Sequence, residues 1–221
     1  MTSSANTGTV SAFERWEQAY QKEDGHRWWP ENELVRFIGR TYGTVEATKL
    51  SRGRALDLGC GTGRHCWLLH EAGFEAFGID ASMSAVERAN DYALKRGANI
   101  ARIGCRDVTD LSCYRDDCFA LVIDCQTIQH LSLDDHRRVY RQISRVLASG
   151  GRFWTMHWRE GDADQLYAGH YPELRAWPIN ELGPLIEANG LELQGDPYLI
   201  TRGNLEQRVM ASWYAMGFVK P

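Results

Sequence analysis

The chain has 221 residues, of which 25 are Lys or Arg and 29 are Asp or Glu, so its formal net charge is −4 with neutral histidines. This length favours a single domain, because one hydrophobic core usually divides only beyond about 250–300 residues. The negative charge disfavours a protein that binds nucleic acid through phosphate contacts. No uninterrupted apolar run approaches the roughly 20 residues of a membrane helix. The six cysteines include no Cys-x-x-Cys pair, so we expect neither a zinc site nor a disulfide framework.

The N-terminal part of the chain predicts a tail followed by a helical cap. Residues 1–10 are rich in Ser, Thr and Asn and lack the segments of a signal peptide, so we expect a disordered tail on a cytoplasmic protein. A first helix is expected at 13–20, and a second starts near Pro30, which suits the first turn of a helix. The apolar face of the second helix consists of Leu34, Val35, Phe37 and Ile38. Both helices belong to an N-terminal cap at residues 11–50.

From Arg54 onward, short apolar runs alternate with longer amphipathic segments. The apolar runs lie at 55–58, 76–79, 100–103, 119–123 and 152–156. The amphipathic segments lie near 63–72, 82–96, 132–148 and 179–189. Such alternation predicts a parallel sheet with helices on both faces, in a single domain that spans residues 11–221. The final apolar segments have no helix-length spacers and predict an antiparallel hairpin, at 191–193, 198–201 and 208–218.

The most informative segment is the loop after the first predicted strand, which contains three glycines at alternate positions: Gly59, Gly61 and Gly63. Glycine permits positive φ and a close approach of the backbone to a ligand. The helix that follows offers free N–H groups to an anionic group. The dinucleotide-binding pattern Gly-x-Gly-x-x-Gly needs a different spacing, and in the register that starts at Gly61 the last glycine is replaced by Cys66. The spacing therefore disfavours a site for NAD.

The loop resembles the first motif of the class I S-adenosylmethionine-dependent methyltransferases, and further motifs of that family follow in order between about residues 30 and 160. Asp80 ends the second predicted strand, Asp107 follows the third, and Asp124 ends the fourth. The resemblance implies an α/β fold with a Rossmann-like, seven-stranded, mostly parallel sheet, an antiparallel last strand and a helical N-terminal cap. It also implies S-adenosyl-L-methionine as the cofactor and S-adenosyl-L-homocysteine as the product.

The resemblance assigns roles to particular residues. The glycine loop is expected to wrap the methionine part of the cofactor, Asp80 to accept hydrogen bonds from the ribose hydroxyls, and Asp107 with Val108 to contact the adenine. Trp29 and Arg36 are candidates because the N-terminal segment closes over the cofactor in similar methyltransferases, although plain packing of the cap is the alternative. The expected cofactor-binding residues are Trp29, Arg36, Asp57, Gly59, Cys60, Gly61, Gly63, Asp80, Ala81, Asp107, Val108, Cys125 and Gln126.

His130 is the candidate catalytic residue, because many family members carry a histidine after the fourth strand. It would act as a base or orient the acceptor, and the alternative is a histidine that only closes the loop through backbone bonds. Cys125-Gln126 resembles part of the Pro-Cys-Gln motif of the cytosine-C5 methyltransferases. However, Asp124 replaces the proline, and the chain is too short for a target-recognition domain, so covalent catalysis is disfavoured.

The acceptor is expected beyond the carboxyl ends of the strands, where open α/β sheets bind ligands. The segment 157–178 combines aromatic, His and Arg side chains, which suit a polar ring or an anionic group, and is expected to form a substrate lid. The candidate substrate-binding residues are Trp28, His157, Trp158, Tyr167, His170, Tyr171 and Arg175.

The sequence thus predicts an enzyme that moves the methyl group of S-adenosylmethionine to an O or N atom of a small molecule by in-line displacement. Two alternatives are kept: an RNA or protein methyltransferase, and a non-catalytic module that binds S-adenosylmethionine. Neither a nucleic-acid partner nor a membrane is expected, and the sequence names neither the acceptor nor the oligomeric state.

Overall fold

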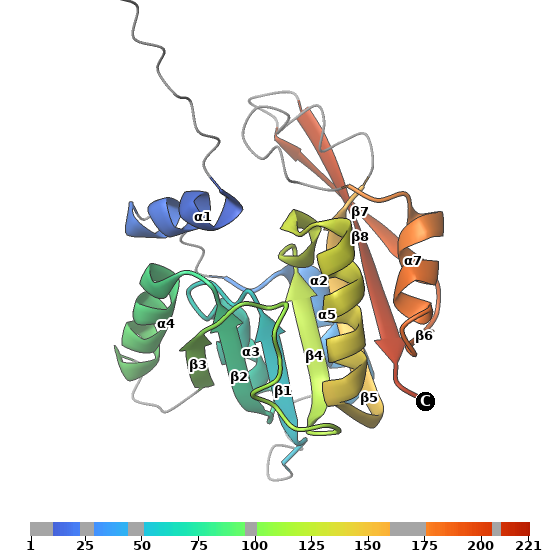
Figure 1. The fold of residues 1–221 in the computed structure, drawn as a ribbon, viewed down its shortest axis with the longest axis horizontal. Helices are drawn as coiled ribbons and strands as arrows, with labels where there is room; N and C mark the ends of the chain where they lie inside the picture. The colour runs from blue at the N-terminus through green and yellow to red at the C-terminus, as the bar shows by residue number, and fades with distance from the viewer. Residues whose placement is uncertain (1–10, 23–28, 44–50, 96–100, 160–175, 205–208) are drawn as a thin grey trace, which may run out of the picture.

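The computed structural model describes residues 11–22, 29–43, 51–95, 101–159, 176–204 and 209–221. Their architecture is α/β, with one central sheet whose strand order is β3-β2-β1-β4-β5-β8-β6 and with β7 also paired to β8 (Figure 1). The strands are β1 (Arg54–Leu58), β2 (Glu75–Asp80), β3 (Ala101–Cys105), β4 (Phe119–Cys125), β5 (Leu147–Trp158), β6 (Glu192–Leu193), β7 (Tyr198–Asn204) and β8 (Val209–Val219). The helices are α1 (Ala12–Gln21), α2 (Asn32–Tyr42), α3 (Arg64–Glu71), α4 (Met83–Lys95), α5 (Leu133–Val146), α7 (Ile179–Glu187) and the short 3-10 helix η2 (Ile128–His130).

The first five strands are parallel to one another and bury a core on each face of the sheet. Because successive side chains of a strand point to opposite faces, Leu56 and Leu58 lie in one core and Ala55 lies in the other. The first core is covered by α5 and α7, and the second by α2 and α3 (Figure 1). The predicted fold class is therefore confirmed, and the predicted strands and helices occur in their predicted order.

The strand count differs from the prediction, because the described residues form a sheet of eight strands and not seven. Strand β8 runs antiparallel to β5, and both β6 and β7 pair with β8, at 218–219 and 209–215 respectively. The two short strands thus follow one another along the same edge of β8. Gly195 has a φ of 72° and Pro197 cannot donate a ladder hydrogen bond, so the edge strand is interrupted at these residues, between β6 and β7.

The junction of α5 and β5 is tighter than predicted. The helix ends at Val146 and the strand begins at the next residue, so the amphipathic pattern near 132–148 overran the helix by two residues. Gly151 lies where a Cβ atom would stand 2.7 Å from the carbonyl oxygen of Ala148. Its neighbour Gly150 has a φ of 75° but faces open space. This turn places β5 beside β4. The carboxyl end of β5 therefore lies with the carboxyl ends of the other parallel strands.

The two helices expected in the N-terminal cap take different positions. Helix α2 packs Leu34 and Ile38 into the core behind the sheet. Helix α1 starts with a capping box between Ser11 and Glu14 and lies against α4, at the carboxyl ends of the parallel strands (Figure 1). The expected tail at 1–10 lies outside the described residues. Within the described ranges, no helix is long and apolar enough to span a membrane.

Candidate active site

A cavity of about 870 Å³ lies between α1 and the loops that follow β1, β2, β3 and β4. Its volume is that of a typical site for a small molecule or a cofactor. Its walls are formed by α1, by the strand-end loops and by the end of β5. The lining residues are Ser11, Ala12, Phe13, Trp16, Ala19, Tyr20, Gly59, Cys60, Gly61, Thr62, Arg64, His65, Asp80, Ala81, Ser82, Cys105, Arg106, Asp107, Val108, Cys125, Gln126, Thr127, Gln129, His130, Leu131 and Trp158.

The glycine loop forms the floor of the cavity and has no room for side chains. Gly59 and Gly61 have φ values of 68° and 53°, in the left-handed region. A Cβ atom on Gly59 would overlap Oγ1 of Thr127, and one on Gly61 would stand 2.6 Å from the hydroxyl of Tyr20. The backbone N–H groups of Gly59 and Cys60 donate to the carbonyl oxygen of Ile79, at 2.8 and 2.9 Å. The loop is thus held to the end of β2 while its open side faces the cavity.

Asp80 stands at the end of β2, where the loop and α4 meet. Its Oδ2 accepts the backbone N–H of Gly61 at 2.8 Å, and its Oδ1 accepts that of Ser82 at 2.9 Å. Burial raises the pKa of Asp80 above its ordinary value, and these two N–H groups act in the opposite direction. The carboxylate therefore braces the glycine loop and is itself a wall of the cavity.

The loop after β3 supplies another wall. Asp107 is exposed at the cavity, and its Oδ1 accepts the backbone N–H of Thr109 at 2.8 Å. The neighbouring Val108 is buried at 6% exposure. A carboxylate beside an apolar side chain suits a flat ring with a polar edge. The thiol of Cys105 donates to the carbonyl oxygen of Ala81 at 3.2 Å, which ties this loop to the end of β2.

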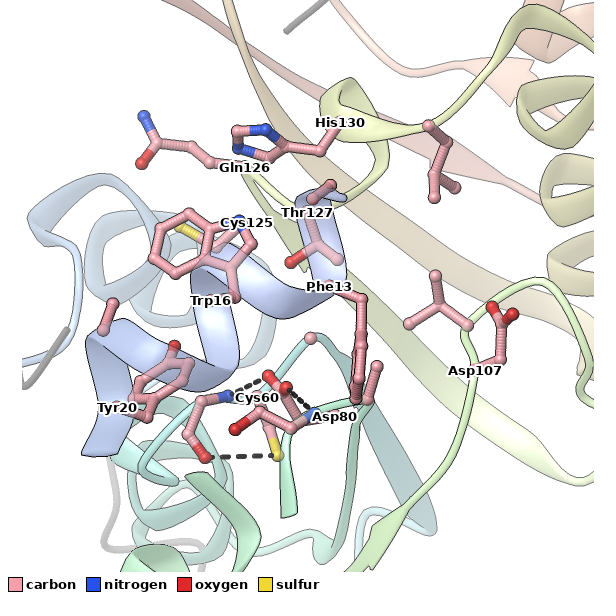
Figure 2. Close-up of a pocket in the computed structure, with 18 of the residues that line it drawn as sticks. Phe13, Trp16, Tyr20, Cys60, Asp80, Asp107, Cys125, Gln126, Thr127 and His130 are labelled. Carbon is pink, nitrogen blue, oxygen red and sulfur yellow. Dashed lines mark hydrogen bonds between the residues drawn. The ribbon is translucent and has the colours of Figure 1, made fainter. Parts of the chain in front are cut away.

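Helix α1 covers the cavity with aromatic side chains that are not among the expected site residues. Figure 2 shows Trp16 and Tyr20 projecting from α1, with Cys60 and Asp80 on one side of them and His130 on the other. The rings of Trp16 and Tyr20 are 6.0 Å apart. Phe13, Trp16 and Tyr20 recur at spacings of three and four residues, which places them on one face of a helix. This spacing in the sequence could have identified the three aromatic residues as candidates for the cavity.

The loop after β4 carries the candidate base. Oδ1 of Asp124 accepts the backbone N–H groups of Thr127 and Ile128 at 2.9 and 3.1 Å, and so fixes the start of η2. Gln126 has a φ of 70°, a strained conformation for a residue other than glycine. His130 ends η2 and meets Trp16 edge to face, with their ring centroids 5.6 Å apart. The loop after β4 therefore contacts α1 at one side of the cavity, through His130 and Trp16.

The comparisons with known proteins agree on one family. Residues 55–151 match the family described as a methyltransferase domain. A 2-heptyl-1-hydroxyquinolin-4(1H)-one methyltransferase of Mycobacteroides abscessus is 29% identical over 174 residues, which cover 73% of this chain and 71% of that protein. The uncharacterized methyltransferase YcgJ of Bacillus subtilis is 31% identical over 124 residues, which cover 55% of this chain and 48% of YcgJ.

A solved structure agrees with this match at the level of the fold. It comes from work on the conversion of a disulfide bond into a thioacetal group during echinomycin biosynthesis. Its TM-score is 0.71 at 21% identity, over 94% of this chain and 92% of that one. The chain is a class I S-adenosylmethionine-dependent methyltransferase.

In this methyltransferase, nine of the expected cofactor residues line the cavity. They are Gly59, Cys60, Gly61, Asp80, Ala81, Asp107, Val108, Cys125 and Gln126. Burial raises the pKa of the Cys125 thiol well above its ordinary value. A thiol held in its neutral form is a poor nucleophile, which further disfavours covalent catalysis.

Four expected cofactor residues do not line the cavity. Gly63 is the N-cap residue that precedes α3, with a φ of 80°. Asp57 is fully buried beneath the glycine loop, 3.7 Å from Nδ1 of His65, and burial raises its pKa well above the ordinary value. The indole of Trp29 is 77% exposed, and only its backbone carbonyl reaches the site, through Arg64 at 2.8 Å. Arg36 is exposed on α2 and pairs with Glu33 at 2.9 Å.

Of the expected substrate residues within the described part of the chain, one lines the cavity and one is buried in the core. Trp158 lines the cavity and packs on Trp213, with their ring centroids 4.5 Å apart. His157 points the opposite way, because β5 continues to Trp158 and its side chains alternate between the faces of the sheet. It is fully buried, with Nε2 3.3 Å from Oδ2 of Asp124. Trp28, Tyr167, His170, Tyr171 and Arg175, with most of the expected lid at 157–178, lie outside the described residues.

The buried pair of Asp124 and His157 supports the loop after β4 from behind. Oδ2 of Asp124 also accepts the hydroxyl of Thr155 at 2.7 Å. Burial raises the pKa of Asp124, but the hydrogen bonds from His157 and Thr155 outweigh it and hold the pKa below its ordinary value. A charged carboxylate is a stronger acceptor than a neutral one, so it holds the N–H groups at the start of η2 more firmly.

Glu17 fastens α1 to the start of α4. Its carboxylate accepts the hydroxyls of Ser82 and Ser84 at 2.6 and 2.5 Å, and also the backbone N–H of Ser84 at 3.3 Å. These bonds, first of all the one from the Ser82 hydroxyl and then the one from Ser84, hold the pKa of Glu17 below its ordinary value. Because Ser82 also donates to Asp80, the helix that covers the cavity and the acid in its wall share one network.

Glu17→Gln is expected to weaken the binding of S-adenosylhomocysteine several-fold. The neutral amide is a weaker acceptor for the two hydroxyls, so α1 is held less firmly over the cavity. Titration calorimetry measures the affinity. Glu14→Gln is the matched control on the same helix, because glutamine preserves a capping box with Ser11. Equal affinities for the two variants would show that Glu17 does not hold the helix in place.

Proposed function

We propose that this methyltransferase transfers the methyl group of S-adenosylmethionine to an oxygen or nitrogen atom of a small aromatic molecule. The observation that carries the proposal is that one cavity is lined by two kinds of residue. The glycine loop and strand-end carboxylates form one part of its lining, and the rings of Trp16, His130 and Trp158 form another, which we call the aromatic chamber. Flat apolar rings favour such aromatic walls. The relative from Mycobacteroides abscessus is named for an aromatic quinolone, which supports the same class of acceptor.

The first part of the cavity fits the cofactor. Glycines without room for a Cβ atom let the backbone approach the methionine part, and Asp80 is placed to accept hydrogen bonds from ribose hydroxyls. Asp107 and Val108 would face the adenine. When bound, S-adenosylmethionine supplies a methyl group on a positively charged sulfur, which is open to attack from the side opposite that sulfur.

The chain's own contribution is to place the acceptor atom in line with this methyl group and to exclude water. Reacting atoms held about 3–3.5 Å apart and correctly aligned gain most of the rate that proximity can give. Trp16 and Trp158 would hold the plane of the acceptor. His130 would take the proton of the acceptor hydroxyl or amine at a ring nitrogen, or hold the acceptor by a hydrogen bond.

A small molecule is favoured over RNA or protein by the charge of the site. Of the described lining residues, the basic ones with a permanent charge are Arg64 and Arg106. Arg64 already donates to the carbonyl oxygen of Trp29 at 2.8 Å and lies 3.4 Å from a carboxylate oxygen of Glu31. A groove that follows a nucleic-acid backbone needs several free cations along its length.

The test is a methylation assay on the purified full chain. The protein is incubated with S-adenosylmethionine and with hydroxylated and aminated aromatic rings, including 2-heptyl-1-hydroxyquinolin-4(1H)-one. We expect S-adenosylhomocysteine together with a product one methyl group heavier, detected by mass spectrometry. Cofactor binding without product from any acceptor would favour the non-catalytic alternative. Faster methylation of RNA or a protein would overturn the small-molecule assignment.

His130→Ala is expected to slow methyl transfer by about 10²-fold, within the usual contribution of a general base. Because His130 lies on the acceptor side of Trp16, the affinity for S-adenosylhomocysteine should change less than twofold by calorimetry. His70→Ala, at an exposed position on α3, is the control. Turnover equal to that of the unaltered protein would leave His130 with a role in loop closure only.

A further inference from the structure

Gln129 is a buried side chain in the wall of the cavity, and one end of its amide is already held. It lies in the middle of η2, is 1% exposed, and lines the cavity. Its Oε1 accepts the backbone N–H of Trp158 at 2.9 Å. Because a backbone N–H can only donate, the oxygen of the amide, and not its nitrogen, must face β5. The orientation of the amide is therefore fixed by its partner.

The other end of the amide is a donor that cannot accept. Nε2 carries two N–H groups, and within the described part of the chain no hydrogen bond from Nε2 is found. Buried donors in folded proteins nearly always have a partner, and one that lines a ligand cavity can obtain it from the ligand. The neighbour His130 contacts Trp16, so the same short helix presents a donor and the candidate base to the aromatic chamber.

We propose that Nε2 of Gln129 donates a hydrogen bond to an oxygen of the acceptor, a carbonyl or an oxyanion on an aromatic ring, and so selects oxygen-bearing rings. The proposal rests on the proposed function of the cavity. The donor is held rigidly, because Trp158 fixes the amide and Asp124 fixes the start of η2. A donor fixed in advance loses little conformational freedom on binding, so it can discriminate between ligands.

The test compares two fragments that differ only at one position: 1-tetralone, which has a ring carbonyl, and tetralin, which has a methylene group there. Their affinities for the complex of the full chain with S-adenosylhomocysteine are measured by ligand-observed NMR. The quantity of interest is the ratio of the tetralin dissociation constant to the tetralone dissociation constant. Comparing this ratio between proteins cancels the difference in hydrophobicity between the fragments.

Gln129→Glu keeps an oxygen for the N–H of Trp158 but places a second oxygen where the donor was. Gln129→Met removes the donor without adding charge. Both variants are expected to lower the ratio about five- to tenfold, the effect of one neutral hydrogen bond. Gln18→Glu makes the same charge change at an exposed position on α1 and should leave the ratio unchanged.

A second measurement does not depend on the folding of the variants. In the unaltered protein, the Gln129 side-chain NH₂ resonances should shift when tetralone is added and stay in place with tetralin. An unchanged ratio in the variants, unmoved resonances, or no binding of either fragment would overturn the role of Gln129. Failure of the proposed function is distinguishable, because the unaltered protein would then fail to bind S-adenosylhomocysteine by calorimetry or to methylate any acceptor.

Discussion

Asp80→Ala is expected to abolish measurable binding of S-adenosylhomocysteine, with a loss of at least 100-fold in affinity. Two hydrogen bonds from ribose hydroxyls to a charged carboxylate would contribute about 1.5–3 kcal/mol each. Their loss alone corresponds to about 10²–10⁴ in the dissociation constant. The same substitution removes the acceptor for the N–H groups of Gly61 and Ser82, so the glycine loop also loses its brace.

Calorimetry with S-adenosylhomocysteine is the measurement, and the thermal midpoint of each variant reports whether it remains folded. Asp91→Ala removes an exposed carboxylate from α4 and is the matched control for the change in net charge. Asp80→Asn should be intermediate, because its amide oxygen can accept one of the two N–H groups while its nitrogen faces the other. Unchanged affinity in Asp80→Ala would remove this residue from the cofactor site.

Gly59→Ala is expected to destabilise the protein by about 2–5 kcal/mol and to weaken cofactor binding at least tenfold. The left-handed conformation costs a residue other than glycine about 1–2 kcal/mol, and overpacking adds about 1–3 kcal/mol. The new Cβ atom would stand 2.6 Å from Cβ of Thr127, which a rotation of the threonine side chain does not move. The backbone of Thr127 is in turn held by Asp124.

Gly150→Ala separates the cost of the left-handed backbone from the cost of overpacking, because Gly150 has a similar φ of 75° but faces open space. Its thermal midpoint should fall by about 2–4 °C, the shift for a loss of about 1 kcal/mol in a chain of this size. The midpoint of Gly59→Ala should fall by roughly 5–15 °C on the same scale. Adding Thr127→Gly to Gly59→Ala should recover part of the loss. Equal midpoints for the two alanine variants would show that the contact with Thr127 gives way easily.

The sequence predicted the strand-end part of the site because local chemistry determines it. A loop of alternating glycines must follow a strand and precede a helix, and Asp80 is fixed by its place at the end of the next strand. Helix α1 was expected in the cover of the cavity only through the family resemblance, and its own sequence does not show how it is held there. Its position depends on Glu17 reaching Ser82, a partner 65 residues away, which no periodicity in either segment reveals.

Residue type alone did not predict where Trp29, Arg36 and His157 lie, because burial depends on the register of a whole element. Trp29 precedes α2 and Arg36 lies on it, and both side chains are exposed and outside the lining of the cavity. His157 was assigned to a lid because the fifth strand was expected to end at residue 156. The strand continues to Trp158, and this extension turns His157 into the core and Trp158 towards the cavity.

The break between β6 and β7 has a consequence for self-association. An unbroken partner along the whole of β8 would offer other molecules one long row of outward N–H and C=O groups, on which a foreign strand can add. The two pieces are two and seven residues long and are separated by Gly195 and Pro197, so their outward rows do not join. The interruption thus works against the addition of a foreign strand along this edge of the sheet.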